Sequence, residues 1–306
     1  MNMKLLLPLL CAGLLTGCTD IRTRLSPDLL AADAGATVRL AAHTTQENAV
    51  ITTETDDFAL LPDALSAAAG AEIAAGHISM LLISGNPCAL LETALQKQWL
   101  PPTGAAVSVS GSACRALCTG AAPSPDQIAA AVDAGLLPCR TADAVLGDLR
   151  GGSGITALHT ASDGNLTLSL WDGARTYGTL SEDACRGLAL FGNRWNSFNF
   201  ACGDGICTVR RTALRTVVTE RAGRLVCTVS GTIFADTEKP ETAGQRLTGM
   251  LTAALAETAG ACGADLLFLR ESAVRSRVSA AKTCSQAEWA QMLCDADYRV
   301  EIAVRV

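Results

Sequence analysis

The 306-residue sequence is poor in aromatic residues and in lysine, and after its first 17 residues it lacks long apolar runs. Aromatic residues make up 4% of the chain, and lysine occurs only at Lys4, Lys97, Lys239 and Lys282. The formal net charge is −6, and no lysine-rich run occurs. Nucleic-acid affinity comes mainly from neutralising phosphates, so this composition argues against nucleic acid as a partner. A membrane-spanning helix needs about 20 apolar residues, so we predict none in the body of the chain.

Common catalytic and metal-binding signatures are also absent. The sequence has no Walker loop, no Gly-x-Ser-x-Gly elbow, no His-Glu-x-x-His and no Cys-x-x-Cys, and it has only three histidines. We therefore expect no catalytic residues, no metal and no cofactor. Apolar residues still make up 49% of the chain, which is enough to bury a large core and excludes a wholly disordered protein.

The first 17 residues have the pattern of a signal peptide. Lys4 supplies a positive charge, and an apolar stretch of residues 5–15 follows, which is too short to span a bilayer. This stretch runs into four residues that resemble the lipobox of bacterial lipoproteins, namely Leu15, Thr16, Gly17 and Cys18. The resemblance implies that the Cys18 thiol receives diacylglycerol and that the chain is cut just before it. Two acyl chains anchor a protein stably, so we expect a lipid-anchored protein on the extracytoplasmic face of a membrane.

The chain has thirteen cysteines, an unusual number for its size. Cys11 would leave with the signal peptide and Cys18 would carry the lipid, so eleven remain and cannot all pair within one chain. Cys202 and Cys207 flank a Gly-Asp-Gly turn and could close a small hairpin disulfide. The alternative for these and the other cysteines is a buried free thiol that packs as a small apolar group.

Predicted helices and strands alternate in the first half of the chain. Residues 78–83 form an apolar run typical of a buried strand, and Ser124, Pro125 and Asp126 are typical of a helix N-terminus. The pattern predicts further helices at 57–75, 88–100 and 141–149, and strands at 35–53 and 105–109. Residues 150–154, Arg-Gly-Gly-Ser-Gly, are the best candidate for a linker.

The second half of the chain has a different pattern. Residues 155–234 are strand-like with frequent Asp-Gly turns, and residues 241–259 form a long amphipathic helix with Leu247, Leu251 and Leu255 on one stripe. A last helix is predicted at 287–294 and a last strand at 299–306. We predict a multi-domain α+β lipoprotein with mixed β-sheets and packed helices. Its parts are a signal peptide (1–17), an N-terminal domain (18–150) that could comprise two subdomains, and a C-terminal domain (155–306).

Four blocks of residues, in order, resemble the C subunits of spore-germination receptors, the Ger(x)C family of lipoproteins. The blocks are Gly17–Asp20, Gly76–Ser84, Tyr177–Leu188, and Gly263–Leu266 with Trp289. Together they extend over nearly all of the chain that follows the signal peptide. Thr19 departs from the pattern, because the family usually has tryptophan there. The chain also lacks the aromatic and lysine content that the family shows near its C-terminus.

The resemblance implies a non-enzymatic subunit of a germinant receptor on the outer face of the spore inner membrane. Its partners would be two integral-membrane proteins, a channel-like A subunit and a transporter-like B subunit. The resemblance marks as structural motif residues Gly76, His77, Gly178, Leu180, Ser181, Glu182 and Gly187. A lone histidine such as His77 is more often a structural residue than a ligand.

Two other classes of protein remain as alternatives. A solute-binding lipoprotein of a transporter would have two lobes of alternating strands and helices around a cleft, which the strand-rich second half fits poorly. An extracytoplasmic thiol enzyme would need an exposed cysteine of low pKa, and the usual Cys-x-x-Cys motif is absent.

Overall fold

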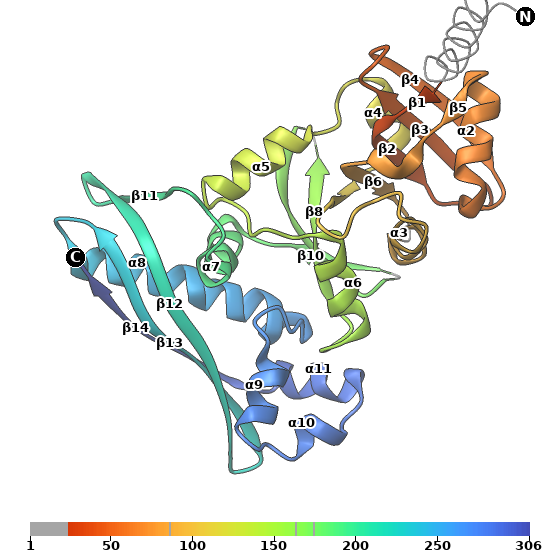
Figure 1. Cartoon of the computed structure of the whole chain (residues 1–306). Helices are drawn as coiled ribbons and strands as arrows, with labels where there is room; N and C mark the ends of the chain where they lie inside the picture. Colours follow the sequence, from red (N-terminus) through yellow and green to blue (C-terminus); the bar gives the residue numbers. More distant parts are fainter. Residues whose placement is uncertain (1–23, 86, 163, 174) are drawn as a thin grey trace, which may run out of the picture.

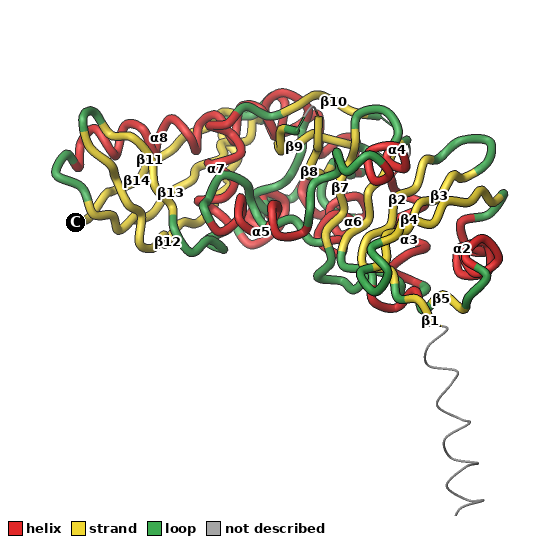
Figure 2. The backbone as a smooth tube through the Cα atoms, turned by 90° about the horizontal axis from the view of Figure 1, so that it is seen from above, coloured by secondary structure: helices red, strands yellow, loops and turns green. Residues whose placement is uncertain are grey.

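The computed structural model describes residues 24–85, 87–162, 164–173 and 175–306. The predicted signal peptide and lipobox, residues 1–18, lie outside the described residues. The body is elongated, with strand β1 (Arg24–Leu25) near one end and the C-terminal sheet at the other (Figures 1 and 2). It contains three sheets with packed helices, which confirms the α+β prediction. Within the described ranges, no helix has both the length and the apolar character that crossing a bilayer requires.

The largest sheet has eight strands in the order β10-β9-β8-β7-β6-β2-β3-β4. The neighbours β2 and β6, β6 and β7, and β7 and β8 are parallel, and the outer pairs are antiparallel. Its strands are β2 (Pro27–Asp33), β3 (Val38–Thr44), β4 (Ala49–Thr55), β6 (Met80–Ser84), β7 (Ala105–Val109), β8 (Thr156–Ser162), β9 (Asn165–Trp171) and β10 (Thr176–Thr179).

Alternating side chains of this sheet bury two separate cores. Leu81 and Ile83 of β6 point to one face, and Met80 and Leu82 point to the other, as strand geometry requires. The first face packs against η2 (Phe58–Leu60), α2 (Leu61–Ala69), α3 (Pro87–Gln96) and α6 (Ala142–Arg150), and the second against α4 (Ala113–Cys118) and α5 (Pro125–Asp133). A short parallel pair of β1 with β5 (Glu72–Ile73) and the turn η3 (Ala75–His77) complete this part.

The eight-stranded sheet includes strands from both sides of the glycine-rich segment 150–154. Strand β8 pairs in parallel with β7, so residues 156–162 continue the sheet of the first half. We expected this segment to link two domains, but Ser153 within it is buried at 7% exposure. The chain passes to the second large sheet only at β11. The sequence did not reveal this, because the pairing of β7 with β8 is a contact between distant residues that local composition does not encode.

The C-terminal sheet has four strands in the order β11-β12-β13-β14, with β13 and β14 parallel. The strands are β11 (Phe198–Cys202), β12 (Gly205–Arg221), β13 (Arg224–Asp236) and β14 (Asp297–Arg305). Beside this sheet lie α7 (Glu182–Gly192), α8 (Pro240–Leu255) continued by the π-turn η4 (Ala256–Gly260), α9 (Leu269–Arg275), α10 (Ala280–Thr283) and α11 (Gln286–Cys294). Leu247, Leu251 and Leu255 of α8 are buried, which confirms the predicted amphipathic helix.

The two faces of the C-terminal sheet differ in their surroundings. Thr216 and Val218 of β12 point to the inner face, where α8 and α9 pack (Figure 1). We call the opposite side the outer face. Arg211 and Arg215 of β12 lie on it and are exposed.

Helix α7 lies in the region that we expected to be only strands and turns. All its residues from Ala184 to Leu190 are buried. The frequent glycine-containing turns on either side of it in the sequence indicated strands and turns instead. Ser181 caps the helix by accepting a hydrogen bond from the Ala184 N–H at 3.2 Å, and Asn193 ends it in the left-handed region at φ 49°.

Candidate functional site at the junction of the two sheets

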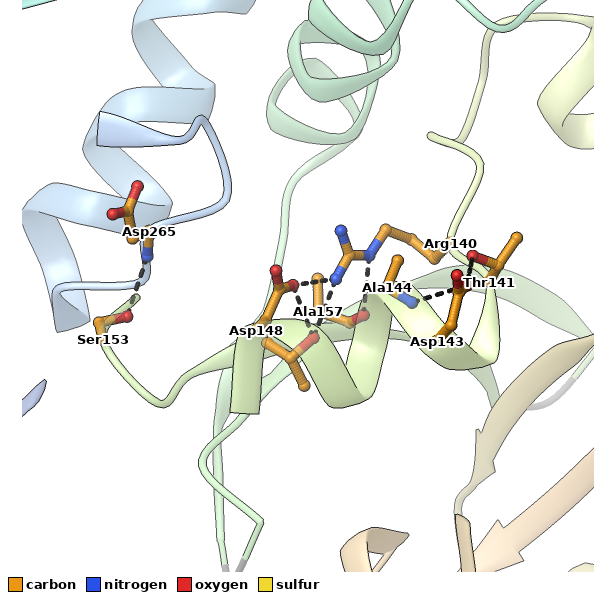
Figure 3. Close-up of polar contacts among 9 residues, drawn as sticks. Arg140, Thr141, Asp143, Ala144, Asp148, Ser153, Ala157 and Asp265 are labelled. Atoms are coloured by element: carbon orange, nitrogen blue, oxygen red, sulfur yellow. Dashed lines mark hydrogen bonds and ion pairs between the residues drawn. The ribbon is translucent and has the colours of Figure 1, made fainter. Parts of the chain in front are cut away.

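A half-buried ion pair fixes α6 to the eight-stranded sheet near the junction (Figure 3). The Arg140 guanidinium pairs with Asp148 and donates to the Thr156 hydroxyl at 2.9 Å and to the Ala157 carbonyl at 3.2 Å. The Thr156 hydroxyl in turn donates to the Asp148 carboxylate at 2.9 Å. The Arg140 and Asp148 side chains are only 12% and 17% exposed, so each charge is satisfied mainly by protein groups.

Asp265 is the centre of a second network on the other side of the junction. Its carboxylate accepts hydrogen bonds from the N–H groups of Leu269 and Arg270 at 2.6 and 2.8 Å, and from the Trp289 indole at 3.0 Å. Its own N–H donates to the Ser153 hydroxyl at 3.0 Å (Figure 3). Burial raises the pKa of the Asp265 carboxyl, and the three N–H donors oppose that rise. Asp265 thus holds α9 and α11 through its carboxylate and the glycine-rich segment through its backbone N–H.

The Arg270 side chain extends the second network. It donates to the backbone carbonyls of Gly152, Ala281 and Cys284 at 2.9, 3.0 and 2.5 Å. Its guanidinium also lies 6.0 Å from the centre of the Trp289 ring. Because its donors are directed at backbone oxygens, Arg270 fastens segments of the chain rather than presenting a charge to solvent.

Two grooves border these networks, and Phe268 lines both. One groove of about 670 Å³ also contacts Arg140, Asp148 and Asp265, and the other, of about 500 Å³, also contacts Arg140 and Trp195. Phe268 is 55% exposed and has φ 56°, an uncommon backbone conformation for a bulky residue. The charged groups of the two networks, Arg140 with Asp148 and Asp265 with Arg270, are directed at one another or at backbone groups.

The third family block lies around the start of α7. Besides capping the helix, Ser181 donates from its N–H and its hydroxyl to the Glu257 carboxylate at 2.8 and 2.5 Å. Leu180 is buried, and Glu182 pairs with Arg186 at 3.2 Å.

Two glycines of the same block serve different local geometries. Gly178 has φ 139° at an irregular register of β10. A Cβ on Gly187 would lie 2.1 Å from the Met250 carbonyl oxygen, so only glycine permits the close crossing of α7 and α8.

Gly76 and His77 lie apart from this cluster. Both are exposed in the short turn η3 near the opposite end of the body, and a Cβ on Gly76 would meet no atom within 4 Å. The space around Gly76 would therefore admit a side chain, and the structural role that the family resemblance implies for these two residues stays a prediction.

Cys202 and Cys207 are both buried free thiols in the structure, so the disulfide that we considered is not formed. The strand register explains this, because Cys202 lies opposite Gly205 and Cys207 lies opposite Phe200. The two cysteines are thus diagonal neighbours rather than direct partners across the hairpin. Burial, with a smaller contribution from Cys202, raises the pKa of the Cys207 thiol to about 11.

Sequence reasoning did not identify Arg140, Asp148, Phe268 or Arg270. Asp265 and Trp289 were named only as parts of one family block, and their direct contact came from the structure. A partly buried arginine that is satisfied by distant backbone carbonyls, such as Arg270, leaves no short-range signal in the sequence. In the described part of the chain, no group of three or more histidine, cysteine or acidic residues is arranged to hold a metal.

Comparison with known proteins identifies a solved structure of similar fold. No family model matches the sequence, and no curated protein matches it. The crystal structure of the GerBC protein is similar with a TM-score of 0.58, covering 90% of this chain and 96% of that chain at 10% sequence identity. An identity this low shows the fold alone. The chain therefore has the fold of the GerBC protein along nearly its whole length, and the predicted likeness to the Ger(x)C family is confirmed at the level of fold.

Proposed function

We propose that this protein is the lipid-anchored C subunit of a spore germinant receptor and that it acts by contact with other proteins. The observation that carries the proposal is the fold shared with the GerBC protein over 90% of the chain. The order of the four sequence blocks and the lipobox at Cys18 support it independently.

The partners in this proposal are the integral-membrane A and B subunits, and the location is the outer face of the spore inner membrane. The role of the subunit is structural and non-enzymatic. The two networks support a rigid body, because one ties α6 to strand β8 and the other ties α9, α11 and the glycine-rich segment to one another. A rigid elongated body suits a protein that must hold membrane partners in a fixed arrangement.

The lipid anchor can be tested with Cys18→Ala. Without the thiol no diacylglycerol can be attached, so we expect the variant to leave the inner-membrane fraction of spores and the germination response to small germinants to be lost. Cys118→Ala is the matched control, because Cys118 is exposed in the body and should affect neither result. Normal germination and membrane localisation of Cys18→Ala would contradict the proposal.

The partners can be tested by affinity purification of the tagged full chain from detergent-solubilised spore membranes. We expect two polytopic proteins at near-equal amounts with the wild-type chain. Purification of a single monodisperse protein, combined with a ligand-dependent rise in its melting temperature, would instead support a solute-binding lipoprotein.

A further inference from the structure

The outer face of the C-terminal sheet carries a cluster of exposed arginines. The strand register places in one row across three strands Arg211, Phe234 and Arg305, and in another row Val217, Thr228 and Arg299. The arginines of the outer face, which we call the arginine face, are Arg211, Arg215, Arg221, Arg224, Arg299 and Arg305. Strand side chains alternate between faces, so all of these project away from α8 and α9.

The arginine face is not neutralised by its own neighbours. The nearby Arg210 pairs with Asp236, but none of the arginines of this face forms an ion pair with a carboxylate of the described residues. On the outer face of β12, β13 and β14 the acidic residues are Asp297 and Glu301, fewer than the arginines, and of these only Glu301 shares a row with an arginine, Arg215. A positive face is notable on a chain of net charge −6, because the remainder of the surface must be still more acidic.

Two arginine contacts on this face are unusual: one pair of arginines destabilises the strand ladder, and one arginine is held in place over an aromatic ring. Arg221 and Arg224 lie directly opposite each other in the ladder, an arrangement of like charges that destabilises a strand pair. The Arg211 guanidinium lies 4.5 Å from the centre of the Phe234 ring, which holds it over the sheet. The folded chain alone gives no reason to keep opposed arginines together, whereas an acidic partner would compensate them.

The dimensions of the face suit an extended segment. Arg211 and Arg221 lie ten residues apart on one strand, which is about 33 Å at the strand rise. Between the charged rows lie Ala213, Thr232 and Ala303, whose small side chains leave a flat floor. An extended peptide presents every second side chain to one side, so about five carboxylates could meet the face over that length.

We propose that the arginine face docks an extended acidic segment of a protein partner. The inference rests on the proposed function in two respects: it expects the partner to belong to the same membrane complex, and it takes the chain to be anchored through a lipid on Cys18.

The position of the face favours a protein segment over the anionic surface of the anchoring membrane. Cys18 and Arg24 are six residues apart, so the connection can extend at most about 20 Å. The N-terminal end of the described body must then stay close to the bilayer, and the C-terminal sheet lies at the far end of the body (Figures 1 and 2). A partner that rises from the membrane could reach that end.

The test measures binding of a fluorescein-labelled peptide of alternating glutamate and serine to the purified full chain in neutral detergent. Fluorescence anisotropy gives the affinity, and a peptide of alternating glutamine and serine reports non-electrostatic binding. The face variant replaces by glutamate Arg211, Arg215, Arg299 and Arg305. The matched control makes the same change in net charge at exposed residues elsewhere, namely Lys97, Arg115, Arg194 and Arg275.

We expect the wild-type chain to bind the glutamate peptide with an affinity that falls as salt is added. The face variant should bind about 30-fold more weakly, because several exposed ion pairs are lost and replaced by repulsion, and the control variant should stay within about twofold. Replacing the same four arginines by lysine should retain most of the binding, because the positive charge of the face is kept, and an unchanged circular dichroism spectrum of the face variant shows that its loss of binding is not loss of folding. Equal weakening in the face and control variants, or equal binding of the glutamine peptide, would overturn the proposal.

Vesicles with and without phosphatidylglycerol test the lipid alternative. If the face variant loses binding to anionic vesicles while its affinity for the glutamate peptide is unchanged, the face is a lipid-binding surface and the proposal is wrong. These measurements use purified protein, so their failure would leave the localisation and germination results for Cys18→Ala untouched.

Discussion

Replacing Gly187 with alanine should separate α7 from α8 and destabilise the protein. A Cβ at this position would lie 2.1 Å from the Met250 carbonyl oxygen, 2.7 Å from its carbonyl carbon and 2.9 Å from the Ala254 Cβ. Two of these three atoms belong to the backbone, so no change of rotamer relieves the clash and the helices must move apart. Overpacking a buried site costs about 1–3 kcal/mol, and a clash with backbone belongs at the upper end.

The matched control is Gly249→Ala in the neighbouring helix. Gly249 is exposed in α8, and a Cβ there would meet no atom within 4 Å. Both substitutions gain about 1 kcal/mol of helix propensity, but only Gly187→Ala incurs the clash. We therefore expect Gly249→Ala to raise the free energy of unfolding slightly and Gly187→Ala to lower it by about 2 kcal/mol.

The measurement is urea denaturation of the full chain in detergent, followed by circular dichroism, with thermal melting as a second probe. A difference of about 3 kcal/mol between the two variants corresponds to melting temperatures roughly 5 °C apart for a chain of this size. If Gly187→Ala were as stable as Gly249→Ala, α7 and α8 would not cross as closely as described here, and the reasoning from glycine at this position would be refuted.

Three further predictions concern titration, thiol reactivity and helix capping. The hydrogen bond to Asp28 raises the pKa of the His43 imidazole. The stability that this pair contributes is therefore present below the unfolded pKa of about 6.5 and is lost as the pH rises through the higher pKa of the folded state. Urea denaturation at several pH values should show that loss in the wild type and not in His43→Gln. Iodoacetamide should modify the exposed Cys118 in the native protein and leave Cys114, whose pKa burial raises to about 12, until denaturant is added; equal labelling by mass spectrometry would contradict this. Ser181→Ala should lower the free energy of unfolding measured by urea denaturation by about 1 kcal/mol, because the Ala184 N–H loses its capping oxygen; an unchanged value would contradict the capping role.

Local patterns in the sequence predicted the elements whose signal is local. The apolar stripe of Leu247, Leu251 and Leu255 identified α8, and Ser124 with Pro125 marked the start of α5, where the structure has a reciprocal capping box. Strand β7 has the predicted bounds, residues 105–109. These signals arise within a few residues, so a single sequence is enough to detect them.

Features that depend on distant contacts were not predictable in the same way. The parallel pairing of β7 with β8 crosses the segment that composition marks as a linker. Among the site residues, Asp265 contacts Ser153 across 112 positions, and no local pattern encodes such a contact.

The eight-stranded sheet determines what would happen if the chain were made as two fragments. Because β7 and β8 are neighbours, cutting the chain within residues 150–154 would leave two fragments that each hold an unfinished part of one sheet. Such fragments should associate when they are synthesised together, whereas either alone would expose the edge of a strand normally covered by the other. A nick in the glycine-rich segment would thus yield a two-chain protein held together by its own hydrogen bonds, rather than two independent proteins.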